Sequence, residues 1–301
     1  MEHLLAELAS LDAGQLLPNE PMAPHTTWQV GGPADVMVIP HTKDQLVRLV
    51  RLLHERKTPW LVIGRGSNLL VTDKGIRGVV IKLGKAFDFV RFDGKTVRAG
   101  GAFSMIKLSV LAGKQGLTGL EFAGGIPGSV GGAVFMNAGA QGSETARVLK
   151  IAEVLLETGE WAEMTAEQLA FSYRHSRLQE MKGIVTEALF ELEHGDRKEI
   201  AAAMATYKDR RLRTQPLKEP SAGSVFRNPE GRHAAKLIEE AGLKGCRIGG
   251  AQVSPLHANF IINTGNATAS DVLALIEHIQ TVVEERFGVR LVPEVRVVGE
   301  R

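Results

Sequence analysis

The stretch from Gly116 to Gly142 constrains this sequence most, because 9 of its 27 residues are glycine in a chain that has 33 in all. It is not a flexible linker, since apolar residues such as Phe122, Ile126 and Val130 stand between the glycines. An apolar segment this rich in glycine indicates backbone that approaches something closely. Successive N–H groups in such a loop form an anion site suited to a diphosphate. Tight turns between strands are the alternative interpretation.

Composition bounds the class of protein. A length of 301 residues suits about two domains. The net charge of +2 gives no electrostatic case for nucleic acid. We expect no membrane span and no signal peptide, because no long apolar run and no basic leader occur, and we therefore expect a cytoplasmic protein. A single cysteine, Cys246, excludes an internal disulfide. The nine scattered histidines predict no metal site.

Hydrophobic periodicity predicts alternating helices and strands. Residues 35–63 read as a strand, a helix and a strand, which predicts a βαβ unit. Thr268 and Asp271 predict a capping box at the start of a long helix. We expect helices at 2–12, 43–57, 103–115, 196–213, 232–241 and 268–287; strands at 35–39, 60–63, 79–83, 184–192, 259–263 and 291–298; hairpins at 87–99 and 151–164; an extended segment at 18–24; and a loop at 171–176.

A second glycine loop, Gly64 to Asn68, directly follows the predicted strand at 60–63. Gly64-Arg65-Gly66 at a strand end suggests a phosphate loop, and an ordinary turn is the alternative. The loop lacks the third glycine and the following helix of the dinucleotide-binding fingerprint. We therefore reject a Rossmann fold here.

Five motifs occur in a fixed order along the chain. They are 64–68, 122–140, Ser172-Tyr173-Arg174, 222–229 and 293–296. Together they closely resemble the UDP-N-acetylenolpyruvoylglucosamine reductase (MurB) family of bacterial cell-wall synthesis, from about residue 25 to residue 299. Ala203 stands only 29 positions after Arg174, so the chain resembles the shorter type, which lacks an extra tyrosine loop and an insertion.

The resemblance implies an α+β fold. It consists of a two-part FAD-binding region of the vanillyl-alcohol-oxidase (PCMH) type and an α/β substrate-binding domain. We expect FAD-binding subdomains at 1–85 and 86–195 and the substrate-binding domain at 196–301, with the C-terminal strand returning to the active site. The resemblance also implies a role in peptidoglycan synthesis, and so in cell shape and division, and we expect a monomer.

The reaction that the resemblance implies has two stages. NADPH reduces FAD, and the enolpyruvyl ether of UDP-N-acetylglucosamine then takes a hydride and a proton to give UDP-N-acetylmuramate. Hydride addition beside a carboxylate builds negative charge there, which a fixed cation must stabilise, and a weak acid must deliver the proton. By resemblance, Arg174 is the catalytic arginine, Ser224 the proton donor and Glu294 the catalytic glutamate.

The resemblance also places the ligands. FAD is expected to bind without a covalent bond, although His25 is a possible attachment point, and its isoalloxazine is expected near 133–139. The expected FAD-binding residues are Gly64, Arg65, Gly66, Ser67, Asn68, Gly124, Gly125, Ile126, Pro127, Gly128, Ser129, Gly131, Gly132 and Ala133. The expected substrate-binding residues are Tyr173, Arg227, Asn228, His257 and Asn259, and the basic run 208–213 is a further candidate for the UDP diphosphate.

Two other functions stay open at this point. One is another FAD-dependent oxidase or dehydrogenase of the same fold that acts on a small alcohol or sugar. It would share the glycine loops and would not need Arg174, Ser224 and Glu294 together. The other is a non-catalytic nucleotide-binding regulator.

Overall fold

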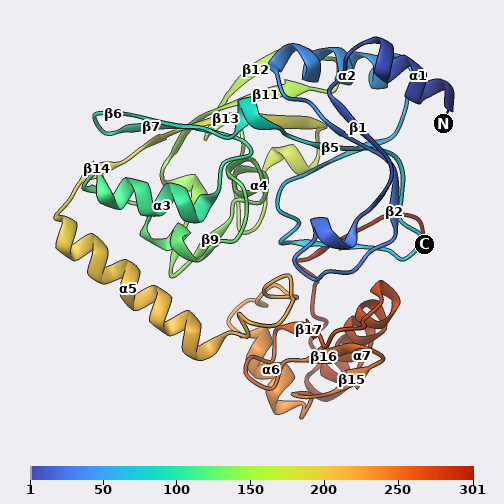
Figure 1. Cartoon of the computed structure of the whole chain (residues 1–301). Helices are drawn as coiled ribbons and strands as arrows, with labels where there is room; N and C mark the ends of the chain where they lie inside the picture. The colour runs from blue at the N-terminus through green and yellow to red at the C-terminus, as the bar shows by residue number, and fades with distance from the viewer. Residues whose placement is uncertain (1) are drawn as a thin grey trace. The chain divides into compact units, whose positions relative to one another are not determined.

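A computed structural model describes residues 2–301 of the chain, and its backbone divides into two compact units (Figure 1). Each unit is assembled from three separate stretches of sequence. This is a different partition from the three-part division at 85 and 195, which stays a prediction. The first unit comprises Met1–Pro18, Val36–Gly64 and Gly78–Arg210, and the second comprises Asn19–Asp35, Arg65–Arg77 and Arg211–Arg301.

A five-stranded antiparallel sheet dominates the first unit, in the order β12-β11-β13-β7-β6. Two helices, α3 and α4, lie along one side of it (Figure 1). Between them and the sheet is an apolar core that includes Val97, Ala152 and Val134. The elements are β6 (Val90–Asp93), β7 (Thr96–Gly100), β11 (Leu149–Leu156), β12 (Trp161–Thr165), β13 (Gly183–Glu191), α3 (Met105–Lys114) and α4 (Val130–Met136).

A four-stranded sheet in the order β1-β2-β5-β3 carries the N-terminal helices. The apolar face of α2 packs into a second core through Leu46, Leu49 and Leu53. Strands β2 and β3 flank α2 as the βαβ pattern predicts, but β5 lies between them and pairs in parallel with β3. The elements are α1 (Glu2–Ser10), β1 (Gln15–Pro21), β2 (Pro33–Ile39), α2 (Lys43–Glu55), β3 (Trp60–Ile63) and β5 (Ile76–Lys82).

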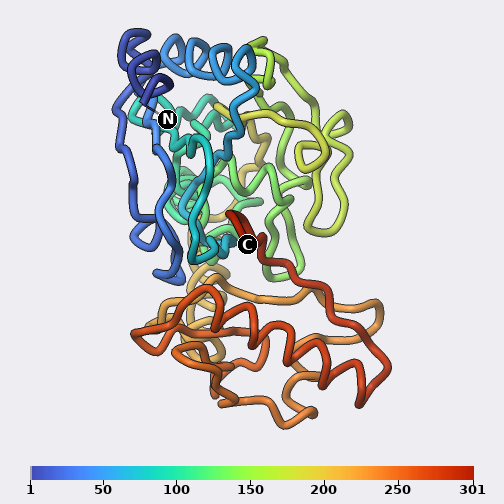
Figure 2. The backbone as a smooth tube through the Cα atoms, turned by 90° about the vertical axis from the view of Figure 1, so that its right-hand side faces the viewer, coloured from blue at the N-terminus to red at the C-terminus, as the bar shows by residue number. Residues whose placement is uncertain are grey.

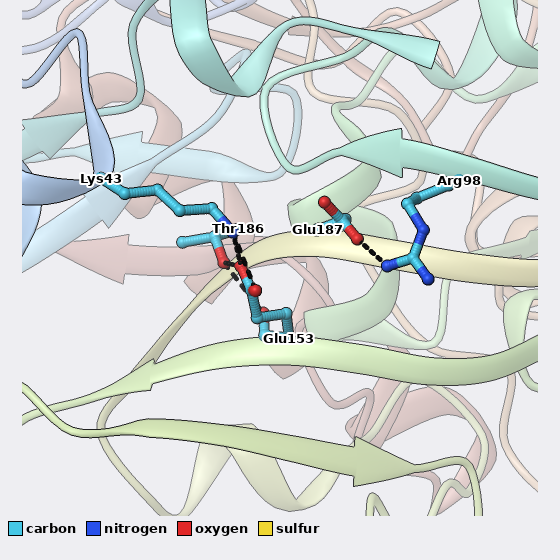
Figure 3. A network of polar contacts seen from close by, with 5 residues as sticks. All are labelled: Lys43, Arg98, Glu153, Thr186 and Glu187. Carbon is cyan, nitrogen blue, oxygen red and sulfur yellow. Dashed lines mark hydrogen bonds and ion pairs between the residues drawn. The ribbon is translucent and has the colours of Figure 1, made fainter. Parts of the chain in front are cut away.

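Two glutamates lie directly opposite each other on the five-stranded sheet, Glu153 on β11 and Glu187 on β13. Each carboxylate has its own cation, as Figure 3 shows. Lys43 Nζ lies 2.6 Å from Glu153 Oε1, and Arg98 pairs with Glu187. Thr186 Oγ1 also donates to Glu153 Oε1 at 2.7 Å. The pairing relieves the repulsion of like charges on neighbouring strands, and Glu187 in turn raises the pKa of Arg98.

The second unit has a core of its own, which gathers Trp28, Leu70, Val225 and Val283 around the long helix α7. Strand β4 pairs in parallel with β18, so a segment from the first third of the chain lies beside its C-terminal part (Figure 2). The elements are β4 (Leu69–Val71), α6 (Ala234–Glu240), β15 (Arg247–Ile248), β16 (Ala251–Val253), β17 (Ile261–Asn263), α7 (Ala269–Phe287) and β18 (Arg296–Val298).

The remaining elements are short, except for the helix α5, whose side chains are mostly exposed. Among the described residues of α5, Ile200 alone has a buried side chain. Arg211 and Arg213 occupy its last turn, where cations suit the helix dipole. The elements are α5 (Arg197–Thr214), β8 (Leu117–Thr118), β9 (Gly139–Ala140), β10 (Ser143–Glu144), β14 (Glu193–His194) and the 3-10 turns η1 (Ala23–His25), η2 (Lys85–Phe87), η3 (Glu121–Gly125), η4 (Thr145–Arg147) and η5 (Arg177–Gln179).

All six predicted helices are confirmed to within a few residues, and so is the capping box, in which Thr268 and Asp271 exchange hydrogen bonds. Three expectations about strands need correction. Only 296–298 of the strand predicted at 291–298 pair as a strand, because Pro293 has no N–H for a ladder. The strand predicted at 259–263 begins at Ile261. The segment 18–24 is not extended throughout, since β1 ends at Pro21 and a 3-10 turn follows.

Candidate functional site

The glycines between 124 and 132 have two different structural roles. Gly131 lets helix α4 pack against neighbouring backbone, because an added Cβ would lie only 3.1 Å from Gly101 O and from Val185 O. Its own N–H donates to Gly101 O at 2.8 Å. Ser129 caps the helix and accepts from Gly132 N. Part of the glycine density therefore serves packing within the first unit.

Packing does not account for the N–H groups of Gly128 and Ser129. Within residues 2–301 neither donates to a protein acceptor, whereas Val130 N–H, the next along the chain, donates to Phe103 O. A Cβ added to Gly64 would overlap Ser129 Oγ, so the end of β3 and the glycine-rich loop meet closely. Two unused donors beside a close contact that favours glycine fit a phosphate group.

The rest of the second loop, 65–68, belongs to the second unit. Gly66 has a left-handed φ of +63°, and an added Cβ would overlap the backbone of His25. Thr27 N–H donates to Gly66 O at 3.2 Å. The N–H groups of Gly66, Ser67 and Asn68 have no acceptor among residues 2–301. This part of the loop thus also presents unused donors.

Asn68 also has a structural role, beside the FAD contact that stays a prediction. Its side-chain Nδ2 donates to Glu294 O at 3.2 Å, and its carbonyl accepts from Arg296 N–H at 3.0 Å. Asn68 therefore ties the glycine loop to the segment that carries Glu294. The structure brings these two predicted site residues together, although 226 positions separate them.

Arg174 lies in a tight turn of the first unit closed between Ser172 and His175. Its φ is +56°, which is unusual for a residue other than glycine. Its Nη2 donates to Gly139 O at 2.8 Å, and its guanidinium lies 4.9 Å from the Tyr173 ring centroid. Tyr173 is 48% exposed. The arginine is thus held beside the C-terminal side of the glycine-rich stretch.

Asn137 anchors this turn and was missed by the sequence reasoning. It ends α4 in the left-handed conformation, with φ +43°, and is fully buried. Its Nδ2 donates to Ser172 O at 2.9 Å, and its Oδ1 accepts from Ala146 N–H at 3.0 Å. An asparagine just after a predicted helix and before Ala-Gly was a detectable signal, because asparagine tolerates that conformation.

Ser224 and Glu294 lie on neighbouring segments of the second unit. Glu294 N–H donates to Val225 O at 2.7 Å, and Phe226 forms a bridge with Pro293. Ser224 is half-buried, and its hydroxyl bonds no protein group within residues 2–301. Two of the three residues that the resemblance assigns to catalysis are therefore neighbours across one short antiparallel contact.

Two of the expected substrate residues, His257 and Asn259, belong to one buried loop. The Asn259 carboxamide bonds both the N–H and the carbonyl of Phe226, each at 2.9 Å. His257 Nδ1 accepts from Asn259 N–H at 3.2 Å, which places the proton of the neutral ring on Nε2. Burial lowers the pKa of His257. The histidine is therefore neutral at pH 7.

Arg227 and Asn228 follow on the same segment. Arg227 Nε is buried without an acceptor among residues 2–301, which makes it an unused donor two positions beyond Val225. Asn228 Oδ1 accepts from Ala234 N–H at 3.0 Å at the start of α6. Asn228 thus has a structural partner, while the buried Nε of Arg227 still lacks one.

His25, the candidate for covalent attachment of FAD, and the basic run have local partners. His25 Nε2 lies 2.8 Å from Glu20 Oε1. In the basic run, Arg211 Nε donates to Gln215 Oε1 at 2.9 Å, and burial lowers the pKa of Arg211. Across the part of the chain that the structure describes, no three His, Cys, Asp or Glu side chains gather as a metal site requires. No helix among residues 2–301 combines the length and apolar character needed to cross a membrane.

Two family models match this chain. Residues 215–298 match the C-terminal domain of UDP-N-acetylenolpyruvoylglucosamine reductase, and residues 34–165 match an FAD binding domain. The chain is 50% identical over 301 residues to the UDP-N-acetylenolpyruvoylglucosamine reductase of Halalkalibacterium halodurans, with 100% of each covered. It is 49% identical over 300 residues to that of Bacillus subtilis, with 99% of each covered.

Solved structures agree with these matches. The crystal structure of UDP-N-acetylenolpyruvylglucosamine reductase (MurB) from Thermus caldophilus has a TM-score of 0.81 and 38% identity, over 94% of this chain and 98% of that one. Berberine bridge enzyme from Eschscholzia californica shares the fold alone, with a TM-score of 0.50 and 12% identity over 64% of this chain and 44% of that one. The predicted α+β fold with a PCMH-type FAD-binding region is confirmed.

Proposed function

This chain belongs to the UDP-N-acetylenolpyruvoylglucosamine reductase family, and from that premise we propose that it reduces the enolpyruvyl ether of UDP-N-acetylglucosamine to UDP-N-acetylmuramate. FAD is its cofactor and NADPH its reductant. One observation carries the proposal, namely identity of about half the residues to reductases of this name over the whole chain. Full-length identity at this level favours the reductase over another flavoenzyme of the same fold and over a non-catalytic regulator.

The first unit offers a site that fits an FAD diphosphate. The unused N–H groups of Gly128 and Ser129 lie in the loop that Gly64 meets, so phosphate oxygens would replace water on donors that the fold leaves unbonded. The resemblance also assigns Gly66, Ser67 and Asn68 to FAD binding, and their N–H groups have no acceptor among residues 2–301. The remaining FAD-binding residues stay as proposed from the sequence, and the FAD is non-covalent.

Bound FAD supplies the hydride, which it receives from NADPH. Arg174 then stabilises the negative charge that builds on the substrate carboxylate, because a guanidinium matches a carboxylate with two parallel hydrogen bonds. Its side chain is fixed by Gly139 O, and its backbone turn by Asn137. A donor held in place before the reaction needs no reorganisation when charge develops.

Ser224 delivers the proton, and Glu294 assists it. A serine hydroxyl is a weak acid, so it transfers a proton only to a strongly basic carbon, such as one beside an enediolate. Supporting this role, the Ser224 hydroxyl has no other partner among residues 2–301, and Glu294 lies on the adjacent segment. Glu294 orients the reacting groups or passes a proton onward.

Substrate contacts are proposed for Tyr173, Arg227, Asn228 and His257. The buried, unused Nε of Arg227 supports its assignment most directly. We also retain the division into residues 1–85, 86–195 and 196–301 as a proposal about which parts bind FAD and substrate. The same proposal includes a cytoplasmic monomer that acts in peptidoglycan precursor synthesis and so in cell shape and division.

The test separates the two half-reactions. The purified protein is expected to show a flavin absorption spectrum that NADPH bleaches without oxygen. Addition of the enolpyruvyl nucleotide should then restore the spectrum. If the nucleotide leaves the flavin reduced, the reductase proposal is wrong.

Ser224→Ala tests the assigned roles. The variant should keep bleaching by NADPH and lose reoxidation by the nucleotide. Equal loss of both half-reactions would instead make Ser224 a residue that positions the flavin.

A further inference from the structure

The segment that carries Ser224 is held from two sides within the second unit. On one side, Glu294 N–H donates to Val225 O and Arg227 N–H donates to Val292 O, at 2.7 and 2.9 Å. On the other side, the partner is a single residue, Asn259. Its carbonyl accepts from Val225 N–H at 2.9 Å, and its carboxamide bonds Phe226 twice.

The Asn259 carboxamide takes the place of a neighbouring strand. Its Oδ1 accepts from Phe226 N–H while its Nδ2 donates to Phe226 O. A side-chain amide is suited to this task because it offers a donor and an acceptor side by side, as a peptide group does. Phe226 and Asn259 are 1% and 5% exposed, so water cannot replace lost bonds, and an unpaired peptide group there is costly.

Little else fixes the position of Ser224. Gly223, directly before it, has φ +74°, and an added Cβ there would meet nothing within 4 Å. The serine is half-buried, and its hydroxyl bonds no protein group within residues 2–301. Hydrogen bonds to Val225 and Phe226, the next two residues, therefore determine where the hydroxyl lies.

We propose that Asn259 is a positioning residue for Ser224, which acts by holding Val225 and Phe226 in register and makes no contact with the substrate. This inference rests on the proposed function, because it takes Ser224 as the proton donor. It replaces the substrate contact expected for Asn259, since both ends of the carboxamide are already bonded to protein.

The test is Asn259→Asp in the full-length holoenzyme. A carboxylate still accepts from Phe226 N–H but faces Phe226 O without a proton to donate. We expect anaerobic reoxidation of the reduced flavin by saturating enolpyruvyl nucleotide to slow on the order of 10- to 100-fold, as misplacement of a reacting group does. Reduction by NADPH should stay within about twofold of the parent, because that half-reaction does not use Ser224.

The matched control is Asn263→Asp. Asn263 is also buried, and its Nδ2 donates to Trp28 O at 3.0 Å. This variant should unfold at a lower temperature and still reoxidise at the parental rate. If both variants slow reoxidation equally, Asn259 has a general structural role and the proposal is wrong. If Asn259→Asp does not fold, Asn259→Gln is tested in its place. Glutamine keeps the carboxamide oxygen and nitrogen but displaces both by one methylene.

A double variant decides whether Asn259 acts through Ser224. Adding Asn259→Asp to Ser224→Ala should cause no further loss of reoxidation rate, because the hydroxyl to be positioned is already absent. A further tenfold loss, or a raised KM for the nucleotide with an unchanged saturating rate, would mean direct substrate contact and overturn the proposal. Failure of the parent protein to reoxidise would instead refute the proposed function, so the two failures are distinguishable.

Discussion

Gly64 and Ser129 stand so close that a side chain at residue 64 would have to displace the Ser129 side chain, since an added Cβ would overlap Ser129 Oγ and lie 3.3 Å from Ser129 Cβ. The two glycine loops of the sequence thus meet at this contact within the first unit. Beside it lie the unused N–H groups of Gly128 and Ser129. The contact therefore determines the shape of the proposed diphosphate site.

The first prediction is that Gly64→Ala weakens FAD binding. The new methyl group must displace the Ser129 hydroxyl and with it the start of α4, so we expect the dissociation constant for FAD to rise about tenfold, which corresponds to about 1.4 kcal/mol. Fluorescence titration of the FAD-free protein measures it. Gly94→Ala is the control, because a Cβ there meets nothing within 4 Å, so its cost is the strain of a side chain at φ +55° and its FAD affinity should stay parental. Unchanged FAD affinity in Gly64→Ala would show that the loop has room to move.

The second prediction concerns Arg174→Lys. Lysine keeps the charge but cannot bond a carboxylate with a planar fork, and its shorter donor loses the fixed contact that Arg174 Nη2 makes with Gly139 O. Reoxidation by the enolpyruvyl nucleotide should slow on the order of 100-fold, as removal of one preorganised donor does. Stopped-flow absorbance measures both half-reactions, and reduction by NADPH should stay unchanged. Parental reoxidation would exclude a role for the fork.

The third prediction concerns Asp73, which caps the long helix α7. Its carboxylate accepts from Ala269 N–H, Ser270 N–H and Ser270 Oγ, at 2.8, 2.9 and 2.5 Å. Asp73→Ala leaves two backbone donors without partners, so unfolding in urea should require about 1 to 2 kcal/mol less free energy. Asp88→Ala is the control, since the exposed Asp88 carboxylate bonds no group within residues 2–301. Equal stability of both variants would contradict the prediction.

The fourth prediction is a pH dependence of stability that comes from His257. In the folded state, burial lowers the pKa of His257 below its ordinary value of 6.5. Just below pH 6.5, the unfolded chain therefore binds a proton at His257 that the folded chain does not. Stability is therefore full above pH 6.5 and falls as pH decreases towards the folded pKa, by at most about 1.4 kcal/mol per pH unit. Urea unfolding between pH 5 and 8 measures the slope. His257→Asn keeps an acceptor for Asn259 N–H without titrating, and it should flatten the slope.

The sequence predicted elements whose evidence is local. The signals for the helix at 269–287, an apolar stripe and a capping box, lie within the helical segment or directly before it. The helix and its capping box are both confirmed. Roles that depend on distant partners could not be predicted. Whether Gly131 serves packing or a ligand depends on Gly101 and Val185, which lie elsewhere in the chain. Asn259 was expected to contact the substrate, because no residue near it in the sequence indicates its true partner. Phe226, 33 positions away, forms hydrogen bonds with both the oxygen and the nitrogen of its carboxamide.

The second unit draws on three stretches that the ribosome makes at very different times. Trp28 Nε1 donates to Ile261 O, 233 residues later. At 5 to 20 residues per second, the tryptophan waits roughly 10 to 50 s for that partner to be synthesised. Trp28, Val30 and Leu70, which share one core, remain exposed to water and to chaperones until then. The second unit must therefore assemble last.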